Sequence, residues 1–153
     1  MLSATVISIY SLFTSALITA DTLMSENTLY IKNLFSSLYK HCAVQPPFCN
    51  DELSESEQSF INTLELLANN SLSDETLYEK GQLLIENIIA NYPMLVPALN
   101  RDILWLLGGN CMHYLGDDEL SDYQRIDELL HEADSNNTPL SFQEAKAKVL
   151  KLH

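Results

Sequence analysis

The chain has 153 residues and a net charge of −13, and a compact fold of this length buries roughly 68–70% of the surface that the unfolded chain exposes. It has 4 Gly and 5 Pro, and most Val, Ile and Thr residues fall in 3.6-residue patterns instead of alternating runs, which disfavours a sheet. The sequence lacks G-x-G-x-x-G, G-x-x-x-x-G-K-[ST], G-x-S-x-G, H-E-x-x-H and C-x-x-C patterns, so nothing points to a nucleotide, esterase, zinc-protease or thioredoxin-type site.

The first twenty residues, MLSATVISIYSLFTSALITA, carry no charge. Export as a secretory signal is one interpretation, but such a signal has a positive start and the first basic residue here is Lys32. Ser and Thr recur at helical spacing on one side, and Val6, Ile9 and Phe13 belong to the opposite, apolar side. We therefore predict a packed amphipathic helix whose charge-free face suits a subunit interface.

Hydrophobic residues at helical spacing predict the rest of the chain in order. The expected helices run from about residue 27 to 41, from a Ser54/Glu57 capping box to Asn69, from Ser73 to Pro93, from Pro97 onward, after Asp117, and from a Ser141/Glu144 capping box onward. Gly81 lies on an apolar stripe, which indicates that another helix crosses there closely. We predict one all-α domain over residues 1–153, a bundle of about seven helices.

The stretch WLLGGNCMHYLGDDEL, residues 105–120, has two interpretations. The favoured one continues the helix through Gly108 and Gly109 to Leu115, with the missing side chains allowing a neighbouring backbone to approach. The alternative ends the helix at the glycine pair, because glycine is the preferred residue after a helix C-terminus.

His113 is the most chemically interesting residue, because Asp117 follows it by one helical turn. A histidine beside a carboxylate can bind a metal, act as a base, or serve as a hydrogen-bonded structural residue. Glu128 and His131 have the E-x-x-H spacing of di-iron bundles, but no second copy occurs. We expect His113 to be structural and no cofactor or metal to be bound.

Charge and cysteine content limit the partners and the compartment. Net charge is zero over residues 1–50, −8 over 51–99, −7 over 100–134 and +2 over 135–153. Without a basic cluster, binding to nucleic acid or to an anionic membrane is not expected, whereas a basic protein partner is compatible. The 3 Cys residues suit a reducing compartment, although Cys42 and Cys49 are close enough in sequence to pair if oxidised. We predict a cytoplasmic protein.

The run RDILWLLGGNCMHYLGDDEL, residues 101–120, resembles a small uncharacterised family of proteobacterial helical proteins. The shared pattern is Arg-Asp, two apolar residues, Trp, then Gly-Gly, Cys, His, an aromatic residue and an acidic helix start. The resemblance implies a proteobacterial cytoplasmic protein. It brings no activity, substrate or site residue with it.

Our functional prediction is a non-enzymatic interaction protein that forms a homodimer or binds a basic partner. Its interface would use the face of residues 1–20 or the surface around Trp105 and Tyr114. The alternative is a metal- or ligand-binding domain, a hydrolase included, centred on His113 and Asp117 with either Glu128 and His131 or Cys111. A third hypothesis, an acidic mimic of nucleic acid, rests on the charge alone.

Overall fold

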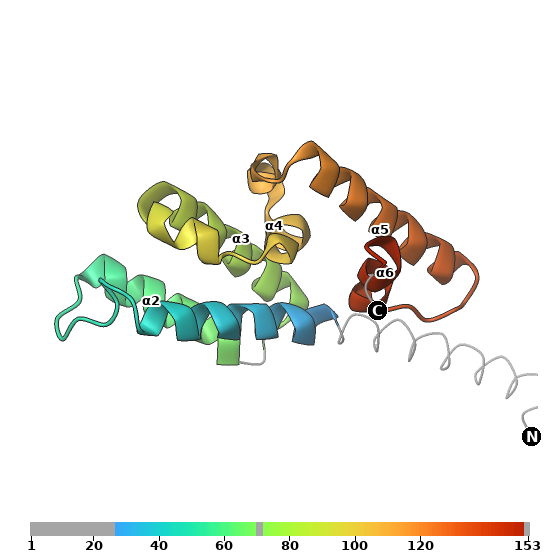
Figure 1. Cartoon of the computed structure of the whole chain (residues 1–153). Helices are drawn as coiled ribbons and strands as arrows, with labels where there is room; N and C mark the ends of the chain where they lie inside the picture. Colours follow the sequence, from blue (N-terminus) through green and yellow to red (C-terminus); the bar gives the residue numbers. More distant parts are fainter. Residues whose placement is uncertain (1–26, 70–71, 152–153) are drawn as a thin grey trace, which may run out of the picture. The chain divides into compact units, whose positions relative to one another are not determined.

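The computed structural model describes residues 27–69 and 72–151, and these form helices joined by turns and short loops, with no strand among them (Figure 1). Residues 27–43 form the first described helical segment. The elements that follow are α2 (Glu55–Asn69), α3 (Asp74–Asn91), the 3₁₀ helix η1 (Pro93–Ala98), α4 (Arg101–Leu107), the 3₁₀ helix η2 (Gly109–Tyr114), α5 (Asp117–Ser135) and α6 (Phe142–Val149). The predicted all-α class is confirmed.

Two compact units make up the described chain. One is the continuous stretch Thr28–Tyr123, and the other is described mainly over residues 124–151, so that α5 begins in the first unit and continues into the second. A single domain over residues 1–153 stays a prediction. The predicted N-terminal helix, with its proposed interface residues Val6, Ile9 and Phe13, lies outside the described residues. None of the described helices combines the length and the apolar character needed to cross a membrane.

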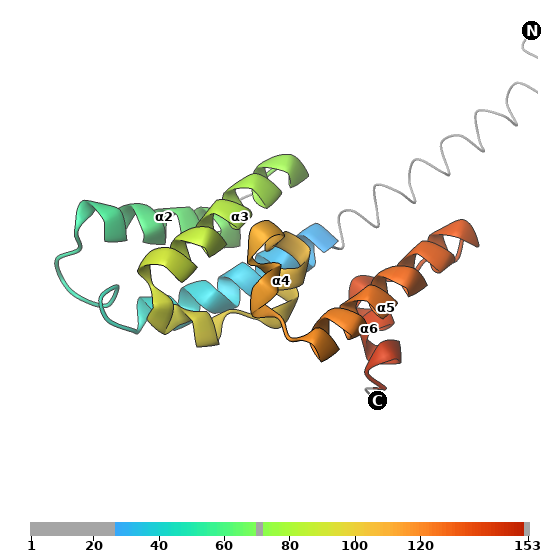
Figure 2. The same ribbon diagram turned by 90° about the horizontal axis from the view of Figure 1, so that it is seen from above.

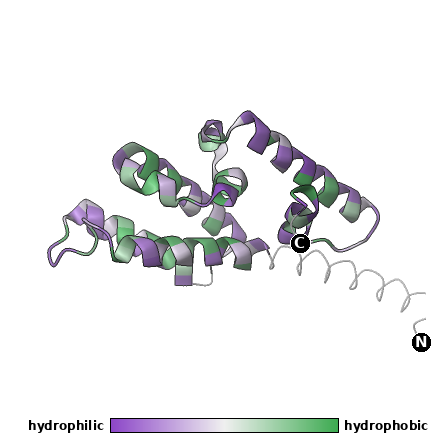
Figure 3. Ribbon diagram, in the orientation of Figure 1, coloured by the Kyte–Doolittle hydropathy of each residue, from purple (hydrophilic) through white to green (hydrophobic). Residues whose placement is uncertain are grey.

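In the first unit α3 is the central helix, since it contacts α2, α4, η1 and η2 (Figures 1 and 2). Hydrophobic residues follow its length in Figure 3. Its buried stripe consists of Leu77, Gly81, Leu84, Ile85 and Ile88, so Gly81 lies on the apolar side of the helix, as predicted.

Gly81 confirms the expectation of a close crossing on α3. A Cβ added at Gly81 would lie 3.0 Å from Leu107 Cδ1 on α4 and 3.1 Å from Phe35 Cζ on the segment 27–43. Both distances are tighter than ordinary contact. The missing side chain therefore allows two other helices to meet α3 at one level.

Capping explains where the helices of this unit start. The Ser54 backbone N donates to Glu57 Oε2 at 2.8 Å, and the Glu57 backbone N donates to Ser54 Oγ at 3.3 Å. This is the predicted capping box, which satisfies two backbone donors at the start of α2. Ser73 caps α3 by accepting a hydrogen bond from the Thr76 backbone N at 3.3 Å.

The predicted helix from Pro97 to Leu115 is wrong at both ends. Pro97 lies inside η1, and α4 begins only at Arg101, after Asn100. The Asn100 side chain accepts a hydrogen bond from the Asp102 backbone N at 2.8 Å, which fixes the start. Prolines cannot donate backbone hydrogen bonds, so the stretch before Asn100 forms a short 3₁₀ turn instead of an α-helix.

The second unit contains the part of α5 from Gln124 onward and the whole of α6. Ser141 and Glu144 form the predicted capping box at the start of α6, and Phe142 and Ala145 are buried. In Figure 3, α5 is mostly hydrophilic, with Ile126 as its buried residue in this unit.

Candidate functional site

The candidate site is built around the joint between α4, η2 and the start of α5. Gly108 ends α4: its backbone N donates to the Leu104 carbonyl oxygen at 3.0 Å, and a Cβ added at Gly108 would lie 2.0 Å from that oxygen. Gly109 has φ +48°, in the left-handed region that favours glycine. The chain therefore leaves the α-helix here, which is the alternative interpretation of the glycine pair.

Gly109 also makes a close approach, but to a side chain and not to a backbone. A Cβ at Gly109 would lie 1.8 Å from Gln82 Nε2 of α3. The Cys111 backbone N then donates to the Gly108 carbonyl at 2.7 Å, which begins the 3₁₀ turn of η2. The two glycines thus turn η2 against α3.

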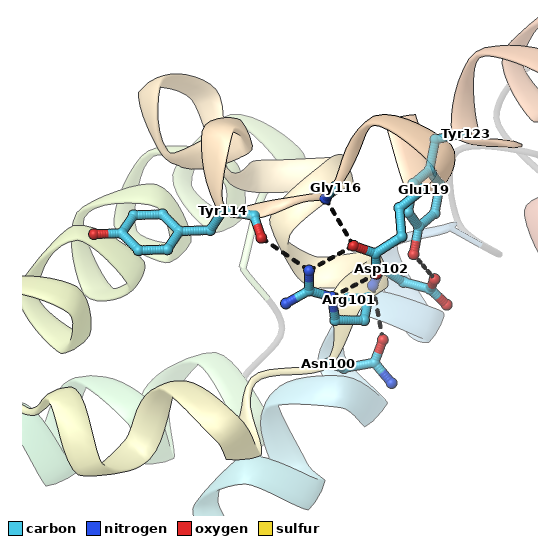
Figure 4. Close-up of polar contacts among 7 residues, drawn as sticks. All are labelled: Asn100, Arg101, Asp102, Tyr114, Gly116, Glu119 and Tyr123. Carbon is cyan, nitrogen blue, oxygen red and sulfur yellow. Dashed lines mark hydrogen bonds and ion pairs between the residues drawn. The ribbon is translucent and has the colours of Figure 1, made fainter. Parts of the chain in front are cut away.

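Arg101 fixes the far end of η2 to α5 (Figure 4). Its Nε and Nη2 donate to the two carboxylate oxygens of Glu119, each at 2.7 Å, and Nη2 also donates to the Tyr114 carbonyl at 2.9 Å. Glu119 Oε2 accepts a further hydrogen bond from the Gly116 backbone N at 2.8 Å. A bidentate guanidinium–carboxylate pair of this kind has a defined geometry.

This ion pair is accessible to solvent, with 45% of the Arg101 side chain and 39% of the Glu119 side chain exposed. The hydrogen bond from Arg101, followed by that from Gly116, lowers the pKa of Glu119 to about 2. The same hydrogen bond raises the pKa of Arg101 above its usual value. The pair therefore stays charged across the physiological range and holds residues 114–119 in one arrangement.

Asp102, the next residue, is fully buried and is the only buried charged side chain within the described ranges. Its Oδ1 accepts a hydrogen bond from the Tyr123 hydroxyl of α5 at 2.5 Å (Figure 4). Its Oδ2 accepts one from the Tyr30 hydroxyl of the segment 27–43. Burial first, and then the hydrogen bond to Asp102, raises the pKa of both tyrosines well above the usual value. Both phenols are therefore protonated donors at neutral pH.

Trp105 is half-buried and stacks on Tyr123, with ring centroids 5.2 Å apart and an interplanar angle of 10°. The predicted interface residue Trp105 thus contributes a large part of its surface to packing inside the first unit. Tyr114 differs, because 43% of it is exposed. Its ring points away from Arg101 in Figure 4, although its carbonyl oxygen is bound there.

The structure does not gather the predicted metal or ligand residues around His113. His113 is exposed, its Nδ1 lies 2.8 Å from the Asn110 carbonyl oxygen, and its ring lies 4.4 Å from that of Tyr114. Asp117 is exposed at the start of α5, whereas Cys111 is buried, and burial raises its pKa.

Glu128 and His131 are exposed on the part of α5 that belongs to the second unit. Across residues 27–69 and 72–151, no group of three or more His, Cys, Asp or Glu side chains could hold a metal ion.

Sequence reasoning missed the two polar centres of this site. Tyr30 and Tyr123 lie 72 and 21 residues from Asp102, and Glu119 lies 18 residues from Arg101. The available signal was the acid at Asp102 directly before the apolar run ILWLL, residues 103–107. A carboxylate among apolar helix residues indicates a buried partner that spacing alone does not identify.

Comparison with known proteins gives a family and no individual relative. No curated protein and no solved structure matches the chain significantly. The family model described as PA2817-like matches residues 23–153, a range that includes every residue that the structure describes and the whole joint between α4 and α5. The resemblance of residues 101–120 to an uncharacterised family agrees with this match, while its motif and proteobacterial origin stay predictions. The chain belongs to the PA2817-like family.

Proposed function

We propose that the protein is a non-enzymatic helical interaction protein that binds a basic segment of a partner protein. The contact is made by the 113–118 surface, which we define as His113, Tyr114, Asp117 and Asp118. The observation that carries this proposal is the exposure of Tyr114 on a segment that is itself held in place. An exposed aromatic side chain on a fixed backbone is the kind of group that dominates interface energies.

Fixation matters because ordering a loop on binding reduces the affinity that its contacts can provide. The hydrogen bond from Arg101 to the Tyr114 carbonyl and the glycine pair hold the two ends of η2. The backbone of Tyr114 is therefore arranged before a partner arrives. Tyrosine also loses little conformational entropy when it is covered, since only two side-chain torsions are fixed.

The charge beside Tyr114 selects the chemistry of the partner. Asp117 and Asp118 are exposed at the start of α5, beside the ion pair that Glu119 makes with Arg101. An interface of standard size covers about 800 Å² on each partner, enough to span an aromatic residue and carboxylates a few positions away. Lysine and arginine side chains of a partner would pair with these carboxylates, and arginine also stacks on aromatic rings.

Site-specific photo-crosslinking tests the proposal in extracts of the source cells. A photoreactive phenylalanine replaces Tyr114, and a matched chain carries it at Tyr78, which is similarly exposed at 40% on α3. We expect a crosslinked partner at position 114 but not at 78. The product should decrease with added salt, because exposed charges are screened beyond about 10 Å at 0.1 M, and it should decrease in the Asp117→Asn/Asp118→Asn double variant.

The mass of the product separates the two kinds of partner. A product of twice the chain mass of 17.3 kDa would establish the predicted homodimer and contradict a basic partner at this surface. Equal crosslinking at positions 78 and 114, or a product unaffected by salt, would refute the proposal. The alternative of a metal site at His113 has no support from the described side chains, and elemental analysis of the purified protein would test it.

A further inference from the structure

The first unit is one continuous stretch, Thr28–Tyr123. A residue at or near each of its two ends donates a hydrogen bond to the same side chain, Asp102. Tyr123 is its last residue and Tyr30 is its third. Each donates its hydroxyl to a different oxygen of Asp102. Two helices that are far apart in the sequence therefore share one acceptor on α4.

The burial of Asp102 makes these two hydrogen bonds depend on each other. Asp102 has 0% exposure, and a buried carboxylate is costly unless donors satisfy its oxygens. If one tyrosine withdraws, the charge on Asp102 loses part of its compensation, and this changes the contribution of the other hydroxyl. Removing either donor thus acts on both helices through the same charge.

Other contacts hold each end separately. The Thr28 hydroxyl donates to Asp74 Oδ1 of α3 at 2.5 Å, and Glu119 of α5 is paired with Arg101. Each of these contacts involves only one end of the first unit. Asp102 differs, because it accepts hydrogen bonds from residues at both ends.

We propose that Tyr30, Asp102 and Tyr123 form an end clasp, through which the two ends of the first unit loosen and tighten together. α5 continues beyond Tyr123 into the second unit. A displacement of α5, whatever causes it, is transmitted through Asp102 to the helical residues 27–43. This inference rests on the hydrogen bonds of Asp102 and is independent of the proposed partner.

Hydrogen–deuterium exchange of the full chain, followed by mass spectrometry, tests the end clasp. We expect Tyr123→Phe to speed amide exchange about tenfold or more both in α5 before residue 124 and in residues 28–36, the size expected for losing a hydrogen bond to a charged group. Tyr30→Phe should speed the same two segments. Tyr78→Phe removes a hydroxyl outside the clasp and should leave both at the wild-type rate.

A variant of the separate contact sharpens the result. Glu119→Gln weakens the Arg101 pair and should speed exchange in α5 while residues 28–36 keep the wild-type rate. If Tyr123→Phe also speeds exchange only in α5 and residues 28–36 keep the wild-type rate, the clasp is refuted.

The double variant Tyr30→Phe/Tyr123→Phe provides a second test that needs no change at Asp102. Coupling through one charge requires its effect to depart from the product of the single effects by about threefold or more. A double effect equal to that product would show two independent hydrogen bonds and would also refute the proposal.

Discussion

The glycine pair at the end of α4 offers a sharp test of the site geometry, because its two members are required for different reasons. In Gly108→Ala the new methyl group would lie 2.0 Å from a backbone oxygen, that of Leu104. In Gly109→Ala it would meet the far end of the flexible Gln82 side chain, and the backbone would keep φ +48°. Gly108→Ala therefore requires the backbone to move, whereas Gly109→Ala places an alanine in the strained left-handed conformation.

The two substitutions should therefore lower the free energy of unfolding by different amounts. Overpacking costs about 1–3 kcal/mol, and Gly108→Ala belongs at the upper end, about 3 kcal/mol, because the obstructing oxygen is part of the last turn of α4. A non-glycine residue in the left-handed region costs about 1–2 kcal/mol. Gly109→Ala should cost that amount and little more, since the Gln82 amide can swing away.

Urea unfolding followed by tryptophan fluorescence measures the difference. Trp105 is the only Trp of the chain and lies in the first unit, so its signal reports on the unit that contains both glycines. Gly116→Ala is the control, because its Cβ would make only an ordinary contact, 3.5 Å from Glu119 Oε2. Gly109→Asn should be milder than Gly109→Ala, since Asn tolerates the left-handed region. Equal destabilisation by Gly109→Ala and Gly108→Ala would contradict the different roles of the two glycines.

Three further outcomes follow from single side chains. The pKa of Glu119 is lowered from 4.5 to about 2, so its pairing with Arg101 stabilises the fold fully above pH 4.5, and this stabilisation is lost as pH falls towards 2. The difference in unfolding free energy between wild type and Glu119→Gln should therefore be constant from pH 7 to about 5 and vanish near pH 2. It should stay below about 1 kcal/mol, because the pair is exposed. Burial raises the pKa of Cys42 to about 11, while Cys49 is exposed. Iodoacetamide at about pH 8 should therefore label Cys49 in the folded protein and label Cys42 only in urea; rapid labelling of Cys42 without urea would contradict its burial. Ser141→Ala removes a capping box worth about 1 kcal/mol and should raise amide exchange in α6 roughly fivefold, with α3 unchanged as the internal reference.

Local signals predicted most of the fold correctly. The capping boxes at Ser54 and Ser141 and the N-cap at Ser73 involve residues three positions apart, so they are visible in any sequence. Gly81 was also interpretable, because a glycine weakens the interior of a helix and is favoured on an apolar stripe mainly where a neighbouring element comes close.

The glycine pair could not be decided by the same means. Helix continuation and termination differ there by contacts to Leu104 and Gln82, and Gln82 belongs to another helix. The candidate site was harder still, since Asp102 finds its partners 21 and 72 residues away. The helical spacing of the residues after Asp117 gave no indication that the Tyr123 hydroxyl donates to a buried carboxylate.

The charge distribution along α5 makes its two ends respond oppositely to ionic strength. Near its start, Glu119 is paired with Arg101, an attraction that added salt weakens. Towards its C-terminus, Glu128 and Glu132 stand one turn apart with like charge, and the last turn has no basic residue to offset the helix dipole. Added salt also weakens this repulsion. High ionic strength therefore destabilises the contact between α5 and α4 but stabilises the C-terminal turns of α5.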